Sequence, residues 1–397
     1  MATTKTALEG IRVLDLGRFQ AGPRAGMVLA RLGAEVIKVE APDGDESRIS
    51  GTGGSVRGQS SYWVQHNSGK KGITLDLRKE KSKEILKELV KISDVFIQNF
   101  RPGTIAEMGF SYEMLHDLNP RIIMLNVSAY GQFGPYRERV GFDSIGQAIS
   151  GFMSVTGYAE NPPTQAGTPV IDRITALHGA IGVLAALRER EISGEGQAID
   201  VCLADTGFSL TEIPITHYLG TGIVAQRTGQ RSGNNISGIY KTKDGWALLA
   251  GTGRNIWPRL CGCINKPEWI EDPSFADPVV RQDNIGMVVE ELTKWFSTRA
   301  TEDAVNTLSD ASVPCAPVND ISQAARSPQL WERECLVEVP DHIAGTIHVP
   351  GKYIRLSRSE TVVGSAPAVG EHNEEVLCGL LHYTPEQVQQ LREEKVI

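Results

Sequence analysis

Apolar residues in the first 200 positions follow two different spacings. Short apolar runs alternate with longer stretches in which apolar residues recur every three or four positions. The short runs predict strands at residues 10–16, 34–40, 73–77, 94–98 and 121–127. Helical spacing predicts helices at residues 24–32 and 79–91. Because such alternation is typical of βαβ units, we expect an α/β fold with a mostly parallel, doubly wound sheet, and ligands at the carboxyl ends of its strands.

The pattern changes near residue 220. A polar, glycine-rich stretch is followed by a predicted hairpin at residues 240–249 and by a mainly helical segment at 269–310. Two strand-like runs, 336–339 and 346–349, precede a helical tail at 385–394. We therefore predict three parts along the chain. Residues 1–220 form a large Rossmann-like domain, 225–325 a smaller α+β domain, and 326–397 a segment that returns to the large domain.

Composition narrows the partners and the compartment. The formal net charge of −8 argues against general binding to nucleic acid or to anionic membranes. Six cysteines show no zinc-ligand spacing, so we expect reduced thiols and no metal. The longest apolar run, 174–187, is shorter than a membrane helix and includes His178. With no apolar leader at the N-terminus, these features predict a cytoplasmic protein.

Common catalytic motifs are absent from the sequence. The loop after the first strand reads Gly17-Arg-Phe-Gln-Ala-Gly-Pro23 instead of the dinucleotide-binding pattern G-x-G-x-x-G. The sequence also has no Walker A, H-E-x-x-H or G-x-S-x-G motif. General motifs therefore leave the chemistry unassigned.

Asp172 directly precedes the apolar helix predicted at residues 174–187. As an N-cap, it would accept backbone N–H bonds and face the positive end of the helix dipole. As a nucleophile, the same helix end would keep the carboxylate ionised and oriented for attack on an activated acyl carbon. Spacing alone does not decide between these two roles.

A series of motifs along the chain resembles the family III CoA-transferases, the group that contains formyl-CoA transferase, carnitine CoA-transferase and α-methylacyl-CoA racemase. The motifs stand in family order over nearly the whole chain, at residues 8–16, 20–23, 32–40, 94–103, 108–109, 118–121, 128–135, 141–143, 172, 194–197 and 370–373.

The resemblance implies an activity and a set of site residues. Asp172 takes the place of the family's nucleophile, which exchanges CoA between carboxylic acids through aspartyl anhydrides and an aspartyl-CoA thioester. Gln20 is placed near the acyl carbonyl as a second catalytic residue. Residues placed along the CoA molecule are Phe19, Gln20, Ala21, Lys38, Asn99, Phe100, Arg101 and Tyr130, with Lys38 near the nucleotide phosphates. Taken alone, Lys38 and Arg101 also suit a solvated surface, and Phe100 and Tyr130 also suit the core.

The resemblance also implies partners and assembly. The substrates are an acyl-CoA donor and a carboxylic acid acceptor, and coenzyme A is a substrate, with no permanently bound cofactor, metal or ATP. The family fold builds its large domain from both chain ends and interlocks two chains. We therefore expect a homodimer whose active site involves both subunits.

Two departures from the family pattern bear on the reaction. Racemases carry a histidine just before the aspartate of the Gly-x-Asp segment, but here that position is Phe142, which cannot transfer a proton. Formyl-CoA transferase has a glycine run where this chain has residues 231–238, with glycine only at Gly233 and Gly238. We therefore favour a transferase with a differently shaped acyl pocket. The alternatives are an acyl-CoA racemase, with His178 as its base, and an inert CoA-binding protein.

Four arginines are candidates for binding a second carboxylate on a dicarboxylic acid: Arg18, Arg24, Arg227 and Arg231. This leads to the hypothesis of succinyl-CoA, or another dicarboxylyl-CoA, as donor.

Overall fold

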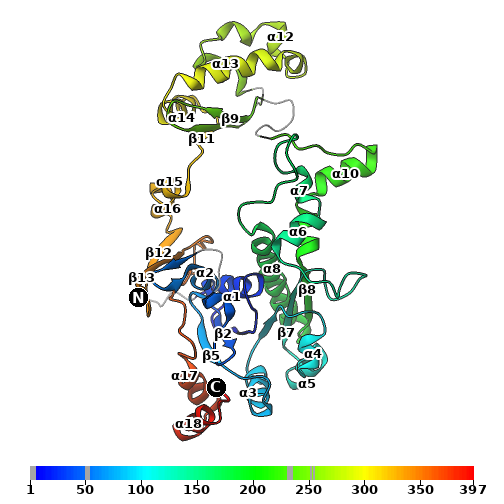
Figure 1. The fold of residues 1–397 in the computed structure, drawn as a ribbon, viewed down its shortest axis with the longest axis vertical. Helices are drawn as coiled ribbons and strands as arrows, with labels where there is room; N and C mark the ends of the chain where they lie inside the picture. The colour runs from blue at the N-terminus through cyan, green and yellow to red at the C-terminus, as the bar shows by residue number, and fades with distance from the viewer. Residues whose placement is uncertain (1–5, 50–53, 230–235, 251–252, 254) are drawn as a thin grey trace. The chain divides into compact units, whose positions relative to one another are not determined.

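The computed structural model describes residues 6–49, 54–229, 236–250, 253 and 255–397. The chain divides into two compact units, coloured by residue number in Figure 1. Unit 1 comprises Met1–Phe152, Ala166–Thr216 and Gln329–Ile397, and unit 2 comprises Met153–Gln165 and His217–Pro328. Unit 1 is thus assembled from both ends of the chain. Residues 153–165 group with unit 2, although the sequence pattern placed them inside the first 220 residues.

A six-stranded sheet forms the centre of unit 1. All of its neighbouring strands pair in parallel, in the order β5-β2-β1-β6-β7-β8. Its strands are β1 Arg12–Asp15, β2 Glu35–Glu40, β5 Lys71–Thr74, β6 Val95–Gln98, β7 Ile123–Ser128 and β8 Ala198–Cys202. The mixed α/β fold with a parallel central sheet, expected from the sequence, is confirmed. β8 was not predicted: Asp200 interrupts this short edge strand, and only its last residue is buried.

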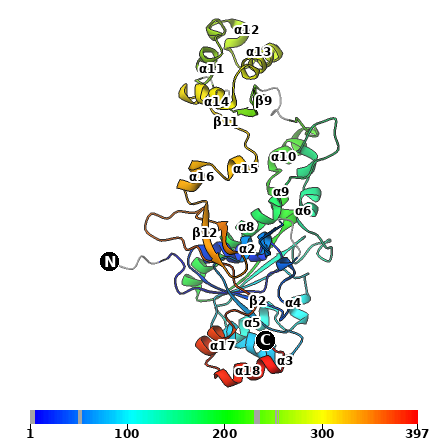
Figure 2. The same ribbon diagram turned by 60° about the vertical axis from the view of Figure 1, so that its left-hand side comes forward.

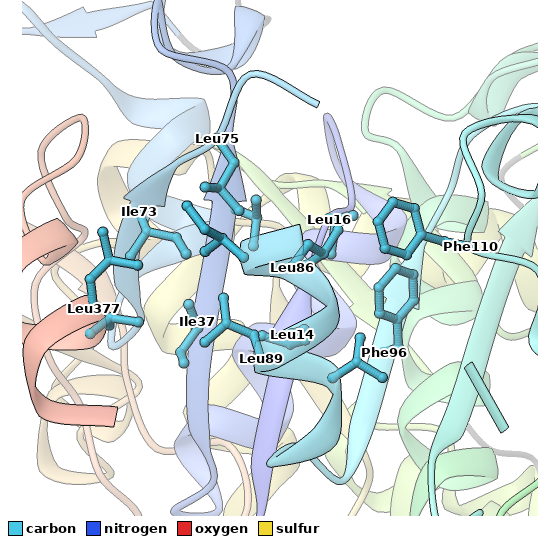
Figure 3. Close-up of a cluster of buried hydrophobic side chains, with 14 of the residues drawn as sticks. Leu14, Leu16, Ile37, Ile73, Leu75, Leu86, Leu89, Phe96, Phe110 and Leu377 are labelled. Carbon is cyan, nitrogen blue, oxygen red and sulfur yellow. The ribbon is translucent and has the colours of Figure 1, made fainter. Parts of the chain in front are cut away.

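Helices cover both faces of this sheet. On one face, α1 and α8 pack over a buried cluster that includes Val13, Ile97 and Leu125. On the other face, α3 and α5 contribute to the buried cluster that includes Leu14 and Phe96. Figure 3 shows Leu86 and Leu89 of α3 in this cluster. Burial of one such side chain contributes roughly 1.5–3 kcal/mol. Helices up to residue 221 are α1 Ala21–Arg31, α2 Ser61–Asn67, α3 Glu80–Lys91, α4 Thr104–Glu107, α5 Tyr112–Leu118, α6 Asp143–Ile149, α7 Phe152–Val155, α8 Val170–Ser193, α9 Leu203–Ser209 and α10 Glu212–Thr221.

The C-terminal segment packs against the N-terminal strands of unit 1. Its elements are α16 Pro328–Glu332, the hairpin β12 Leu336–Asp341 and β13 Gly345–Pro350, α17 Asn373–Leu381 and α18 Pro385–Glu393. Figures 1 and 2 show α17 and α18 near α3, and their apolar residues join the same buried cluster as α3. The hairpin packs instead on α2, around the fully buried Trp63. The same segment thus supports the sheet and the helix α2.

Unit 2 has its own sheet and core. Three antiparallel strands, in the order β11-β10-β9, pack with helices around Tyr240 and Phe296, whose rings stack at 4.8 Å. The predicted hairpin is present, as β9 pairs with β10. The strands and α-helices of unit 2 from residue 238 onward are β9 Gly238–Lys241, β10 Trp246–Leu249, β11 Cys315–Pro317, α11 Trp257–Cys263, α12 Pro273–Ala276, α13 Ile285–Ser297, α14 Thr301–Asp310 and α15 Ile321–Ala324.

The helix α8 is longer than the sequence pattern predicted. It runs for 24 residues and ends at Gly194, which adopts a left-handed conformation with φ of 85°. Its charged last turns, from Arg188 onward, masked this continuation in the apolar pattern. In the described part of the chain, α8 is the one helix with the length and hydropathy to cross a membrane. Since it packs against α1 and the sheet, we interpret it as a core helix.

Asn373 attaches the C-terminal segment to the edge of the sheet. Its Oδ1 accepts from the Thr74 backbone N at 2.8 Å, and its Nδ2 donates to Thr74 Oγ1 at 2.8 Å. Because Asn373→Ala leaves these buried groups without partners, we expect it to reduce the free energy of unfolding by about 1–3 kcal/mol. Chemical denaturation measures this change. Glu374→Ala, at the neighbouring exposed position, serves as control and should change the free energy of unfolding by less than about 0.5 kcal/mol. Equal effects of the two substitutions would contradict a stabilising role for the Asn373–Thr74 hydrogen bonds.

Candidate functional site

A cavity of about 540 Å³ opens in unit 1 around the loops that follow β1, β6 and β7. It therefore lies at the carboxyl ends of parallel strands, where ligands of such sheets bind. Its lining consists of Arg18, Phe19, Gln20, Ala21, Tyr62, Asn99, Phe100, Arg101, Pro102, Thr104, Val127, Ser128, Ala129, Arg139, Val140, Gly141, Phe142, Asp172 and Leu203. Seven of the nine residues singled out from the sequence meet here: Phe19, Gln20, Ala21, Asn99, Phe100, Arg101 and Asp172.

The loop after β1 is held by a buried ion pair. Lys70 Nζ lies 2.6 Å from Asp15 Oδ2 and donates to the Pro23 carbonyl at 2.7 Å, while Asp15 Oδ1 accepts from the Gly17 backbone N at 2.8 Å. Both charged side chains are fully buried. Burial lowers the pKa of Lys70 to about 8. Removing one partner would leave a buried, uncompensated charge, so the pair fixes the start and end of the loop.

The backbone of this loop is strained at the cavity wall. Phe19 has φ of 60°, a left-handed conformation that bulky residues rarely adopt. Gln20, which follows it, is buried, and its Nε2 donates to the Pro169 carbonyl at 3.4 Å. That bond is long, so the amide is available to a stronger acceptor in the cavity.

Asn99 joins the loop after β6 to the loop after β1. Its Oδ1 accepts from the Arg18 backbone N at 2.7 Å, and its Nδ2 donates to the Arg18 carbonyl at 2.7 Å. Gly22 allows this approach, because a Cβ there would lie 3.3 Å from Asn99 Cγ. The Arg18 guanidinium itself pairs with Glu46 at 2.7 Å.

Asp172 is the third residue of α8, and Pro169 occupies the N-cap position. The N-cap role considered from the sequence is therefore wrong. The Asp172 backbone N donates to Asp143 Oδ1 at 3.0 Å. Within the described chain, the Asp172 carboxylate itself has no hydrogen-bonding or ionic partner. It thus faces the cavity without a fixed contact.

The pKa of Asp172 is raised to about 7, first by burial and then by the nearby charge of Asp143. The expectation that the helix end keeps this carboxylate ionised is therefore corrected. A helix N-terminus stabilises an anion by about 0.3–1 kcal/mol, which is too little to offset such burial. Near neutral pH, the carboxylate is poised between its protonated and nucleophilic forms.

Asp143 and Gln147 of α6 hold the start of α8. The Gln147 Nε2 donates to Asp143 Oδ2, and the Gln147 Oε1 accepts from the Ala166 backbone N at 2.9 Å. Both side chains are buried. The pair therefore fixes the backbone of Asp172 while leaving its carboxylate free.

Sequence reasoning missed several residues of the cavity. Tyr62 lines it from α2, and burial together with the charge of Asp172 raises the pKa of its hydroxyl. Arg139 adds a guanidinium from the loop after β7. Asp143 stood in a motif that drew attention only to Phe142. No local pattern signals Tyr62, because 110 residues separate it from Asp172.

Lys38 and Tyr130 lie outside the lining of this cavity. The Lys38 side chain is buried, and its Nζ donates to the Gly17 carbonyl and lies 3.6 Å from Asp45 Oδ2. The Tyr130 ring packs edge-on to Tyr136 at 5.9 Å. In this structure, Lys38 therefore supports the loop after β1.

Other candidates from the sequence lie elsewhere. In unit 2, the Arg227 guanidinium donates to the carbonyls of Tyr158, Ala159 and Asn161. His178 Nδ1 lies 3.2 Å from Thr206 Oγ1, and His178 does not line the cavity. Arg231 and Gly233 fall outside the described residues. Among the residues described, no group of three His, Cys, Asp or Glu side chains is arranged to hold a metal ion.

Comparison with known proteins places these features in a family. Residues 8–373 match the model of CoA-transferase family III. The chain is 36% identical to succinyl-CoA–D-citramalate CoA-transferase from Chloroflexus aurantiacus, over 98% of each chain. It is 34% identical to formyl-CoA:oxalate CoA-transferase from Streptomyces coelicolor, over 99% of this chain and 100% of that protein.

A solved structure shares the fold. A CaiB/BaiF family protein from Brucella suis matches with a TM-score of 0.84 and 30% identity, over 95% of this chain and 100% of that one. The family match spans the cavity loops, α6 and Asp172 at the start of α8. The chain therefore belongs to CoA-transferase family III.

Proposed function

We propose that this protein transfers CoA from an acyl-CoA donor to a free carboxylic acid, with Asp172 as covalent nucleophile. The observation that carries the proposal is the Asp172 carboxylate, which lines the cavity without a partner and has a pKa raised to about 7. A carboxylate serving only the fold would be expected to hold a cap or an ion pair. Family membership supports the same chemistry.

In the first half of the reaction, an ionised Asp172 oxygen attacks the thioester carbonyl carbon of the donor. The C–S bond breaks, CoA leaves as its thiolate, and a mixed aspartyl-acyl anhydride remains. The thiolate then attacks the aspartyl carbonyl carbon and expels the donor acid as a carboxylate. The enzyme is left as an aspartyl-CoA thioester.

In the second half, the acceptor carboxylate attacks the aspartyl carbonyl and releases the CoA thiolate. The aspartyl and acceptor acyl groups are then joined in a second anhydride. The thiolate attacks the acceptor's acyl carbon, so that the acceptor leaves as its CoA thioester and the Asp172 carboxylate is restored. One thioester replaces another, so the exchange needs no ATP. Catalysis then depends on positioning and on stabilising negative charge at the carbonyl oxygens.

We assign the remaining residues from their places around the cavity. The weakly bonded Gln20 amide donates to the developing oxyanion. Phe19, Ala21, Asn99 and Phe100 line the path of the pantetheine arm. Arg101 supplies positive charge for the phosphates, and Arg139 adds a second guanidinium.

Lys38 and Tyr130, which the resemblance places along CoA, lie outside the cavity lining. For Lys38 we propose a supporting role beneath the loop, in place of a phosphate contact, because its ammonium is buried on Gly17 and Asp45. Tyr130, which lies next to this wall of the cavity, remains a proposed contact for CoA itself and not for the acyl group.

We also propose how the protein assembles, where it is located and which donor it uses. We propose an interlocked homodimer in the cytoplasm. A dicarboxylyl-CoA such as succinyl-CoA is our proposed donor, supported by relatives named as succinyl-CoA-dependent transferases. Racemisation is disfavoured, since Phe142 lines the cavity where a base would be required.

Trapping with hydroxylamine tests the nucleophile. Incubation with a productive acyl-CoA should convert Asp172 to its hydroxamate, because hydroxylamine displaces CoA from the aspartyl carbonyl. Mass spectrometry of the peptide that contains Asp172 measures the product, which should be absent from Asp172→Ala. If CoA binds but no donor from a broad panel modifies Asp172, the covalent mechanism is refuted.

The pH dependence of trapping tests the state of the nucleophile. Only the ionised carboxylate attacks, and its pKa is raised to about 7. The initial trapping rate should therefore rise about tenfold per pH unit below 7 and level off above it. Asp143→Asn removes the neighbouring charge and should move the midpoint to lower pH. A rate that is flat from pH 5 to 8 would contradict the raised pKa.

A further inference from the structure

Three arginines gather beside the nucleophile in unit 1. Arg24 and Arg31 lie on α1, and Arg173 directly follows Asp172 on α8. Helix α1 packs against both α8 and α2, and α2 brings His66 to the same place. Arg173 acts electrostatically on Arg24, and Arg24 acts on Arg31. The pKa of His66 is lowered first by burial and then by the charges of Arg24, Lys70 and Arg173. We call Arg24, Arg31, Arg173 and His66 the arginine cluster.

In the part of the chain that the structure describes, no carboxylate offsets the charge of the arginine cluster. Arg24 Nε, Arg31 Nη1, Arg173 Nε and His66 Nδ1 are buried and have no hydrogen-bond partner. Arg31 is 6% exposed and His66 is 1% exposed. The Arg31 guanidinium donates to Ser68 Oγ at 2.7 Å and to the Met27 sulfur. Among the described residues, no carboxylate forms an ion pair with Arg24, Arg31 or Arg173.

Two other arginines of unit 1 differ in having a carboxylate partner, although Arg190 Nε is also buried without a hydrogen bond. Arg48 pairs with Glu40 at 2.7 Å, and Arg190 pairs with Asp94 at 2.9 Å. Arginine remains protonated at neutral pH, so three neighbouring guanidiniums without an anion are unfavourable. A bound carboxylate would offset their repulsion and satisfy the orphaned N–H groups by charge-assisted hydrogen bonds.

The arginine cluster adjoins the catalytic cavity through Tyr62. The Tyr62 side chain lines the cavity together with Asp172. Asp172 and Arg173 act on the Tyr62 hydroxyl with opposite sign, so it lies within reach of both charges. His66 lies one turn further along α2, with its ring edge-on to Tyr62 at 4.9 Å. On α1, Arg24 follows one turn after Ala21, which also lines the cavity.

We propose that Arg24 and Arg173 bind the second carboxylate of a dicarboxylic substrate whose first carboxyl group reacts at Asp172. Arg31 adds its positive charge from further along α1. This inference rests on the proposed CoA transfer and adds the residues that select the acid. It also narrows the four arginines suggested by the sequence. Arg18 is paired with Glu46, Arg227 is satisfied by backbone carbonyls, and Arg231 lies outside the described residues.

Exchange with labelled acids tests the arginine cluster without knowledge of the natural acceptor. In one assay, succinyl-CoA is incubated with labelled succinate. In the other, butyryl-CoA, in which a methyl group replaces the second carboxylate, is incubated with labelled butyrate. A hydrogen bond to a charged group contributes about 1.5–3 kcal/mol. Arg24→Met and Arg173→Met should therefore each lower kcat/KM for succinate exchange by about 10- to 150-fold. Butyrate exchange should change by less than about threefold.

Arg188→Met is the matched control, because Arg188 lies on the same helix α8 with its side chain 70% exposed. It should leave both exchange rates unchanged. Equal losses for succinate and butyrate in the cluster variants would overturn the inference. Loss of dimer in sedimentation, with an unchanged succinate-to-butyrate ratio, would instead assign the cluster to a carboxylate from a second copy of the chain.

Direct binding separates this inference from the proposed mechanism. Free succinate should raise the Tm of the wild-type protein more than butyrate does, and Arg24→Met should remove the difference. If no acyl-CoA modifies Asp172 but this difference is present, the mechanism fails and the carboxylate site stands. If Asp172 is modified but succinate and butyrate stabilise equally, the mechanism stands and the site is refuted.

Discussion

The site depends on a carboxylate that lies partly buried in the cavity wall and, among the described residues, has no partner. Asp172 lies in the first turn of α8, yet burial and the charge of Asp143 raise its pKa to about 7. Folding must therefore offset the cost of this arrangement elsewhere in unit 1. The cost has a chemical use, because a desolvated carboxylate of raised basicity is a stronger nucleophile than one stabilised by a cap or an arginine.

The surrounding contacts position the backbone of Asp172 without neutralising its carboxylate. Asp143 accepts from the backbone N of Asp172, and Gln147 holds Asp143 in turn. The buried Asp15–Lys70 pair and the hydrogen bonds between Asn99 and the Arg18 backbone fix the loop that contains Gln20. Rigid support thus reaches the backbone on both sides of the cavity, while the reacting groups stay free to bond the substrate.

The sequence predicted what local patterns determine. Strand and helix spacing indicated the parallel sheet and its helices, and the resemblance supplied Asp172 and six further residues of the cavity lining. The sequence did not predict that α8 starts at Val170, because Pro169 and the contacts of Asp143 determine where the helix begins. Nor did it predict the raised pKa or the roles of Tyr62 and Arg173. These follow from burial among segments far apart in the chain, which no local pattern records.

The pH dependence of stability measures the central claim, the raised pKa of Asp172, most directly. In the unfolded chain this carboxyl group ionises near 3.9, whereas in the folded protein it stays protonated up to about 7. Ionisation therefore favours the unfolded state as pH rises between these values, and Asp172→Asn removes that effect. At fixed protein concentration, the gain in unfolding free energy from Asp172→Asn should be near zero at pH 4, grow toward pH 7 and stay constant above it. A difference that does not vary with pH, or one that shows wild type increasingly favoured at high pH, would contradict the account.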